Sequence, residues 1–158
     1  MVPTRILLVD DYSRWRLTAR SILEETGEFR IIGEAADGLE AIEKTATLLP
    51  DLVLLDIGLP KLNGIEAAKK IRQTSPASKV IFVTQEQDSE IRAAALATGA
   101  AAYVVKSRAA SELLHTIERV IVTGKSLRHH SEHVSLAPAI LPRDVELCDS
   151  VIEAESTV

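Results

Sequence analysis

Apolar residues along the chain fall into short continuous runs and longer periodic ones. The short runs at 6–9, 52–55 and 79–83 are rich in Val, Ile and Leu, which is typical of parallel strands buried on both faces. A run at 30–35 carries charge and glycine, and a brief one occupies 103–105. We therefore predict five strands, with the second and fifth at the edges of the sheet.

The longer runs repeat their apolar residues at helical intervals and end at glycine or proline. This periodicity predicts helices over 13–26, 38–49, 62–75, 88–99 and 113–124, the last one closed by Gly124. Each strand is thus followed by a helix. Such alternation predicts an α/β fold, a doubly wound parallel sheet with helices on both faces. The strand order 2-1-3-4-5 places the two weak strands at the edges.

Four of the predicted strands end on polar side chains, which are Asp10 and Asp11, Asp56, Thr84 and Lys106. The carboxyl ends of parallel strands share one edge of the sheet, where ligands bind in such folds. In the order 2-1-3-4-5 the first and third strands are neighbours, so we expect their carboxylates to converge.

Converging carboxylates repel one another, and the usual resolution is a hard divalent cation. Mg²⁺ is the natural candidate because it accepts carboxylate, water and phosphate oxygens. A nearby Lys can attract a phosphoryl oxygen, and a Thr hydroxyl can hydrogen-bond to the same group. Together these groups are what phosphoryl transfer to an aspartate requires, and we take Asp56 as the nucleophile.

These residues resemble the receiver domain of bacterial two-component response regulators, over residues 5 to about 123 in the family's order and spacing. The motifs that carry the resemblance are Val9-Asp10-Asp11, Leu55-Asp56 with Leu59-Pro60, Val83-Thr84, and Gly99-Ala100 leading to Tyr103-Val104-Val105-Lys106. The resemblance implies a flavodoxin-like (βα)₅ fold, and the strand order is carried over with it.

The resemblance also implies the roles of the acidic residues. Asp56 matches the phosphoacceptor, which takes a phosphoryl group from a histidine kinase, a phosphotransfer protein or a small donor. Asp11, Asp56 and the backbone carbonyl of Gly58 match direct Mg²⁺ ligands. Asp10 matches the acid that reaches the metal through water.

The remaining matched residues belong to phosphoryl binding and switching. Lys106 matches the phosphoryl-binding lysine, Thr84 the switch hydroxyl, and Tyr103 the aromatic that swings inward behind it. The implied output face is the last two helices and the strand between them. The resemblance implies that phosphorylation shifts the population between two pre-existing conformations of this face. The mixed charges of those helices permit a homodimer through this face without requiring one.

Some residues depart from the family pattern at positions that affect the lifetime of the phosphoryl group and the efficiency of switching. Gly58 and Glu86 occupy positions that tune the lifetime of the phosphoryl group, and glycine there leaves more room for water. Gln85 replaces the usual small residue, and Ser107 replaces a frequent proline or aspartate. Two alternatives stay open on the same fold, a Mg²⁺-dependent phosphohydrolase and a pseudo-receiver that is not phosphorylated. Enzymatic activity beyond autophosphorylation and autodephosphorylation at the aspartate is not expected.

Composition and charge limit the partners and the cellular compartment that we expect for this chain. The net charge of −5 argues against a nucleic-acid surface over the whole domain. The single cysteine, Cys148, cannot form an internal disulfide. We find no signal peptide pattern at the N-terminus and no apolar run of membrane-spanning length, so we expect a soluble cytoplasmic signalling protein.

The pattern changes near residue 124, so we predict a receiver domain over 1–124 and a tail over 125–158. The tail is expected to be mostly irregular, with room for one short helix. Residues 141–147 faintly resemble the start of the helix-turn-helix that follows nitrate-regulator-type receivers. No basic recognition helix follows, and we do not expect this chain to bind DNA. Trp15 is expected to pack on the first helix near the acidic edge.

Overall fold

The computed structural model describes residues 2–128 and 146–147. The strands are β1 (Thr4–Val9), β2 (Phe29–Ala35), β3 (Leu52–Leu55), β4 (Lys79–Thr84), β5 (Ala102–Val105) and β6 (Glu146–Leu147). The helices are α1 (Ser13–Glu24), α2 (Gly38–Leu48), α3 (Gly64–Thr74), α4 (Ser89–Leu96) and α5 (Ala109–Arg128), and a 3₁₀ turn covers Lys106–Arg108. Strand and helix alternate from β1 to α5, as the hydrophobic pattern predicts.

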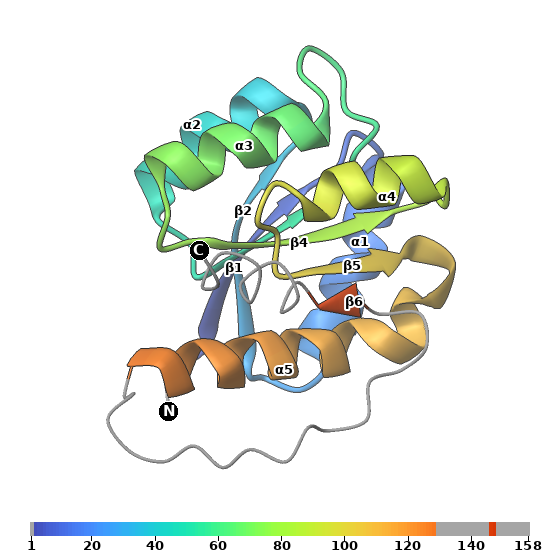
Figure 1. Ribbon diagram of the computed structural model, residues 1–158. Coiled ribbons are helices and arrows are strands. Elements are labelled where there is room, and N and C mark those ends of the chain that lie inside the picture. Colours follow the sequence, from blue (N-terminus) through green and yellow to red (C-terminus); the bar gives the residue numbers. More distant parts are fainter. Residues whose placement is uncertain (1, 129–145, 148–158) are drawn as a thin grey trace.

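The strands form one sheet in the order β2-β1-β3-β4-β5-β6 (Figure 1). The first five are parallel, which confirms the predicted order 2-1-3-4-5. The two-residue β6 pairs antiparallel with β5, with Ala102 opposite Leu147 and Tyr103 opposite Glu146. We did not predict this strand. It lies beside β5, which therefore is not the edge of the sheet.

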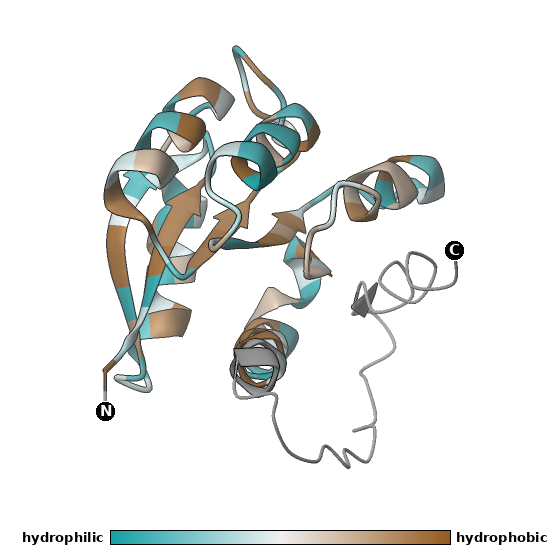
Figure 2. Ribbon diagram, turned by 60° about the vertical axis from the view of Figure 1, so that its left-hand side comes forward, coloured by the Kyte–Doolittle hydropathy of each residue, from teal (hydrophilic) through white to brown (hydrophobic). Residues whose placement is uncertain are grey.

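Two apolar layers fill the space between the sheet and its helices. On one face β-strand residues pack with Ala19 and Leu23 of α1 and with Leu113 and Ile117 of α5. On the other face they pack with α2, α3 and α4 (Figure 1). The strands are mainly hydrophobic, whereas the helices carry both hydrophobic and hydrophilic residues (Figure 2). β3 is buried at all four positions, as expected for a central strand covered on both faces.

Several helix boundaries differ from the predicted ones, among them the end of α1 and both ends of α5. α1 ends at Glu24, and Gly27 follows with a positive φ of 72° in the turn before β2. α5 runs through Gly124 to Arg128, so the prediction that Gly124 ends this helix is wrong. A glycine inside a helix costs only about 1 kcal/mol relative to alanine, which a long helix can bear. The predictions for the tail at 129–145 and 148–158 lie outside the described residues.

Candidate functional site

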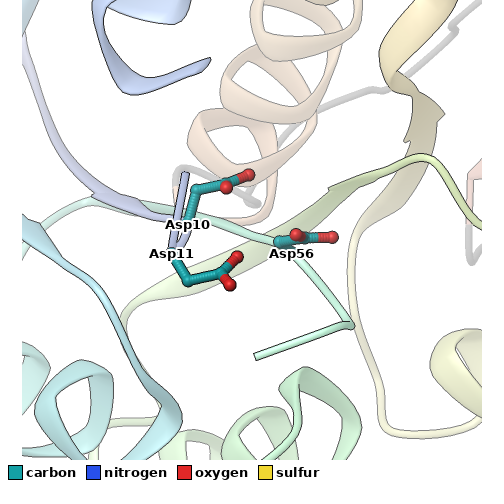
Figure 3. Close-up of side chains that lie close together, drawn as sticks. All are labelled: Asp10, Asp11 and Asp56. Carbon is teal, nitrogen blue, oxygen red and sulfur yellow. The ribbon is translucent and has the colours of Figure 1, made fainter. Parts of the chain in front are cut away.

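Three carboxylates meet at the carboxyl ends of β1 and β3. Val9 and Leu55 are partners in the sheet, and the amide of Asp56 donates a hydrogen bond of 3.1 Å to the carbonyl of Val9. Asp10, Asp11 and Asp56 therefore follow two neighbouring strand ends, with one ligand oxygen from each within 4.8 Å of the others (Figure 3). Asp10 and Asp56 are buried and Asp11 is exposed.

Lys106 enters this cluster from the end of β5. Its Nζ lies 2.5 Å from Oδ2 of Asp10 and 3.3 Å from Oδ2 of Asp56, and its side chain is 9% exposed. Burial raises the pKa of Asp10, and the hydrogen bond from Lys106 opposes that shift. The ammonium thus compensates part of the negative charge of the two buried acids.

The donor set fits a hard divalent cation. All three groups offer carboxylate oxygens, which Mg²⁺ prefers, and the exposed Asp11 leaves the cluster open to solvent on one side. Gly58 is exposed, and a Cβ built on it would meet no atom within 4 Å. The space around Gly58 is therefore open, which agrees with the expectation that glycine leaves more room for water here.

An ion-pair network behind the acids ties their loop to α1 and β2. Arg16 donates from Nη1 to the carbonyl of Asp10 at 2.5 Å and from Nε to Glu34 at 2.7 Å. Arg20, one turn further along α1, donates to the second oxygen of Glu34 at 2.6 Å. Hydrogen bonds from Arg20 and then Arg16 hold the pKa of Glu34 below its usual range. We did not predict this network, although Arg16 and Arg20 lie four residues apart in the sequence.

Thr84 and Tyr103 lie on the neighbouring strands β4 and β5 and are linked through one loop residue. The Thr84 hydroxyl accepts a hydrogen bond from the amide of Glu86 at 3.3 Å. The hydroxyl of Tyr103 donates to the carbonyl of Glu86 at 2.7 Å. Tyr103 is fully buried, with the guanidinium of Arg92 5.0 Å from its ring centre. Burial raises the pKa of Tyr103 to about 12, so the phenol is neutral and able to donate.

The sequence profile of the response regulator receiver domain matches residues 6–118. The chain belongs to this family. The match covers every residue of the acidic cluster, together with Lys106, Thr84 and Tyr103. The resemblance to the receiver family that the motifs indicated is therefore confirmed.

Relatives and solved structures agree with this assignment. The chain is 35% identical to a putative transcriptional regulator of Pseudomonas aeruginosa over 118 residues, which are 75% of this chain and 56% of that protein. It is 34% identical to the chemotaxis protein CheY of Thermotoga maritima over 116 residues, 73% of this chain and 96% of that protein. A solved structure of the CheX–CheY complex with BeF₃ and Mg²⁺ from Borrelia burgdorferi matches with a TM-score of 0.69 and 28% identity. The match covers 76% of this chain and 90% of the chain in that structure.

The chain thus matches CheY over nearly its whole length but spans about half of the transcriptional regulator. Within the receiver, the structure brings Asp10, Asp11, Asp56 and Lys106 together. The contacts that we missed come from α1, whose polar residues resemble an ordinary exposed helix face in the sequence. No helix in the described part of the chain is long and apolar enough to cross a membrane.

Proposed function

We propose that this receiver accepts a phosphoryl group on Asp56 and uses it to switch its binding surface. The observation that carries the proposal is the contact of Lys106 with both Asp10 and Asp56, beside the exposed carboxylate of Asp11. A nucleophilic carboxylate, an acidic metal-binding cluster and a buried ammonium are the parts that phosphoryl transfer needs.

In the proposed reaction an oxygen of the Asp56 carboxylate attacks the phosphorus of the donor. The bond from phosphorus to the donor's imidazole nitrogen, or to the acetyl oxygen of acetyl phosphate, breaks as the new bond forms. The donor leaves with the electron pair of the broken bond. Lys106 lies 3.3 Å from Asp56, close enough to pair with a phosphoryl oxygen attached there.

Mg²⁺ is the proposed cofactor, held by Asp11, Asp56 and the carbonyl of Gly58, with Asp10 reaching it through water. When bound, it neutralises the charge that gathers on the phosphoryl oxygens. Receiver domains generally depend on Mg²⁺, and the similar CheY complex contains both Mg²⁺ and BeF₃. The oxygen-only cluster of this chain supports the same requirement.

Thr84 and Tyr103 are the proposed switch. Both hydrogen-bond to Glu86, so movement of the Thr84 hydroxyl toward a phosphoryl group would release one of the two bonds that hold this loop. Because Tyr103 lies on β5 between α4 and α5, a change there reaches the α4-β5-α5 face. We propose this face as the surface for an output protein or for a second copy of the chain.

The proposed donor is a histidine kinase or a phosphotransfer protein, which fits a cytoplasmic signalling role. DNA binding is not part of the proposal, because the chain carries a net charge of −5. Gly58, two residues after Asp56, offers no acid for a phosphohydrolase, so the receiver function is favoured over that alternative.

The test is intact mass spectrometry after incubation with acetyl phosphate and Mg²⁺. Wild-type protein should gain one phosphoryl group, and Asp56→Asn should gain none. Asp51→Asn is a matched control, because Asp51 is an exposed carboxylate at the opposite end of β3. Labelling of Asp56→Asn to the wild-type level would refute the assignment. A wild-type protein without label would favour the pseudo-receiver.

A further inference from the structure

Trp15 lies against the ammonium of Lys106. The Nζ atom is 5.3 Å from the centre of the indole ring, within the range in which an aromatic face attracts a cation. Trp15 is half-buried and packs against the apolar layer between the sheet and α1 and α5. We predicted packing for this residue, and the structure adds a contact with a charged group of the site.

The ring is held in place by the first turn of α1. The amide of Trp15 donates to the carbonyl of Tyr12 at 3.0 Å. The next residue, Arg16, is bonded to the carbonyl of Asp10 and to Glu34. The first turn of α1, which carries Trp15, is thus attached to the end of β1 that carries the acids, and this fixes the position of Trp15 relative to them.

On its open side Lys106 borders a groove of about 470 Å³. The groove is lined by Tyr12, Arg14, Trp15, Gln85, Lys106 and Ser107, among others. A lysine has a flexible four-carbon stem and a strongly hydrated ammonium, so an adjoining groove offers it room to leave the acids. The indole ring lines the same groove, and its attraction for the ammonium favours the position near Asp10 and Asp56.

We propose that Trp15 is a positioning residue that keeps the Lys106 ammonium in the phosphoryl site. This inference rests on the proposed function, since it assigns Trp15 a part in the same reaction. Asp10 and Asp56 already pair with this ammonium, and their carboxylates compete with the phosphoryl oxygens for its positive charge. A neutral aromatic ring attracts the ammonium without neutralising it, so the charge stays available for the incoming group.

The first test compares Trp15→Leu with Trp15→Phe. Leucine keeps an apolar side chain at the interface but removes the aromatic face, whereas phenylalanine keeps a face. With acetyl phosphate and Mg²⁺, Trp15→Leu should label Asp56 about fivefold more slowly, as expected for a contact of about 1 kcal/mol. Trp15→Phe should stay within about twofold of wild type. The Mg²⁺ affinity should be unchanged in both, because Trp15 offers no oxygen ligand.

The second test uses the fluorescence of Trp15, which is the only tryptophan in the sequence. Adding beryllofluoride with Mg²⁺ should change its emission in wild type as the ammonium moves toward the phosphoryl mimic, and Lys106→Met should abolish that change. Leu17→Ala, at an exposed position on the same helix, should respond as wild type does. This readout requires no substitution of Trp15, so it decides the matter even where Trp15→Leu fails to fold.

The outcomes separate the two proposals. A wild-type protein that takes no label overturns the proposed function. A wild-type protein that is labelled, with Trp15→Leu labelled at the same rate, overturns only the role of Trp15. An emission change in Lys106→Met equal to that of wild type also overturns it. Slow labelling in Trp15→Leu, rescued by phenylalanine, supports the inference, since a purely structural defect would not be rescued by an aromatic ring.

Discussion

The acidic half of the site and its other half, the proposed switch, which we call the switch half, are held in different ways. At the acidic half, Asp10 and Asp56 share the Lys106 ammonium, and Arg16 ties the Asp10 carbonyl to Glu34. At the switch half, Thr84 and Tyr103 each make one hydrogen bond to the backbone of Glu86. Charged contacts from several elements therefore fix the first half, whereas one loop residue connects the second. Phosphoryl chemistry needs fixed groups, and a switch needs contacts that can be exchanged.

The largest effect should come from the backbone that supports the acidic half. A Cβ on Gly64 would collide with the carbonyl oxygen of Asp56, whereas a Cβ on Gly58 would meet no atom within 4 Å. Gly64→Ala should therefore lower the free energy of unfolding by more than about 2 kcal/mol, because backbone cannot give way as a side chain does. Gly58→Ala should change it by less than about 0.5 kcal/mol. Urea denaturation of both variants measures the difference, and equal stabilities would contradict the close packing at Gly64.

Mg²⁺ should stabilise the acidic half by mass action. At a concentration ten times its Kd, the free energy of unfolding should rise by about 1.4 kcal/mol, and the Tm by a few degrees. Asp11→Ala should remove this gain because it deletes the exposed carboxylate of the cluster. Asp51→Ala is the control, since Asp51 lies at the far end of β3 and should keep the full gain. Differential scanning fluorimetry with and without Mg²⁺ measures it, and equal shifts in wild type and Asp11→Ala would count against a site there.

The sequence alone was enough to predict that Asp10, Asp56 and Lys106 converge. Each of them follows a continuous apolar strand, and the carboxyl ends of parallel strands lie at the same edge of the sheet. The contacts of Arg16 were not predictable in this way. They depend on the pairing of β1 with β2, which places Glu34 opposite Leu8 and brings it near α1. β6 was missed because two residues carry no alternation that a pattern could reveal. The periodicity of apolar residues shows which face of an element is buried. Polar contacts between elements depend instead on the register of the paired strands, which periodicity does not give.

At the switch half, Tyr103→Phe keeps the buried ring and removes only the hydroxyl that donates to Glu86 at 2.7 Å. The loss should be about 1 kcal/mol in the free energy of unfolding, the usual net value of one hydrogen bond. In wild type a spectrophotometric titration should show this phenol ionising only near its raised pKa of about 12. Tyr12→Phe is the matched control, because Tyr12 is 56% exposed and its removal should cost little. A Tyr103→Phe protein as stable as this control would mean that the hydroxyl does not hold the loop.

The smallest effect concerns the ion pairs behind the acids and should depend on pH. The pKa of Glu34 is lowered from its ordinary 4.5, so its charged form is favoured in the folded state. A carboxyl with a lowered pKa contributes stability above its unfolded value, and that contribution disappears as the pH falls through the folded value. Because the Glu34 side chain is 34% exposed, solvent screening limits the contribution to about 1 kcal/mol or less.

Glu34→Gln should therefore be less stable than wild type at pH 7, and the gap should close as the pH falls below 4.5. Urea denaturation at a series of pH values measures the gap. Glu66→Gln removes an exposed carboxylate that pairs with Lys69 at 3.1 Å on α3, and it should show a smaller gap at neutral pH. A Glu34→Gln gap that persists unchanged at acidic pH would show that the packing of the side chain, and not its charge, stabilises this region. The charge of Glu34 would then contribute nothing to the stability of the acidic half.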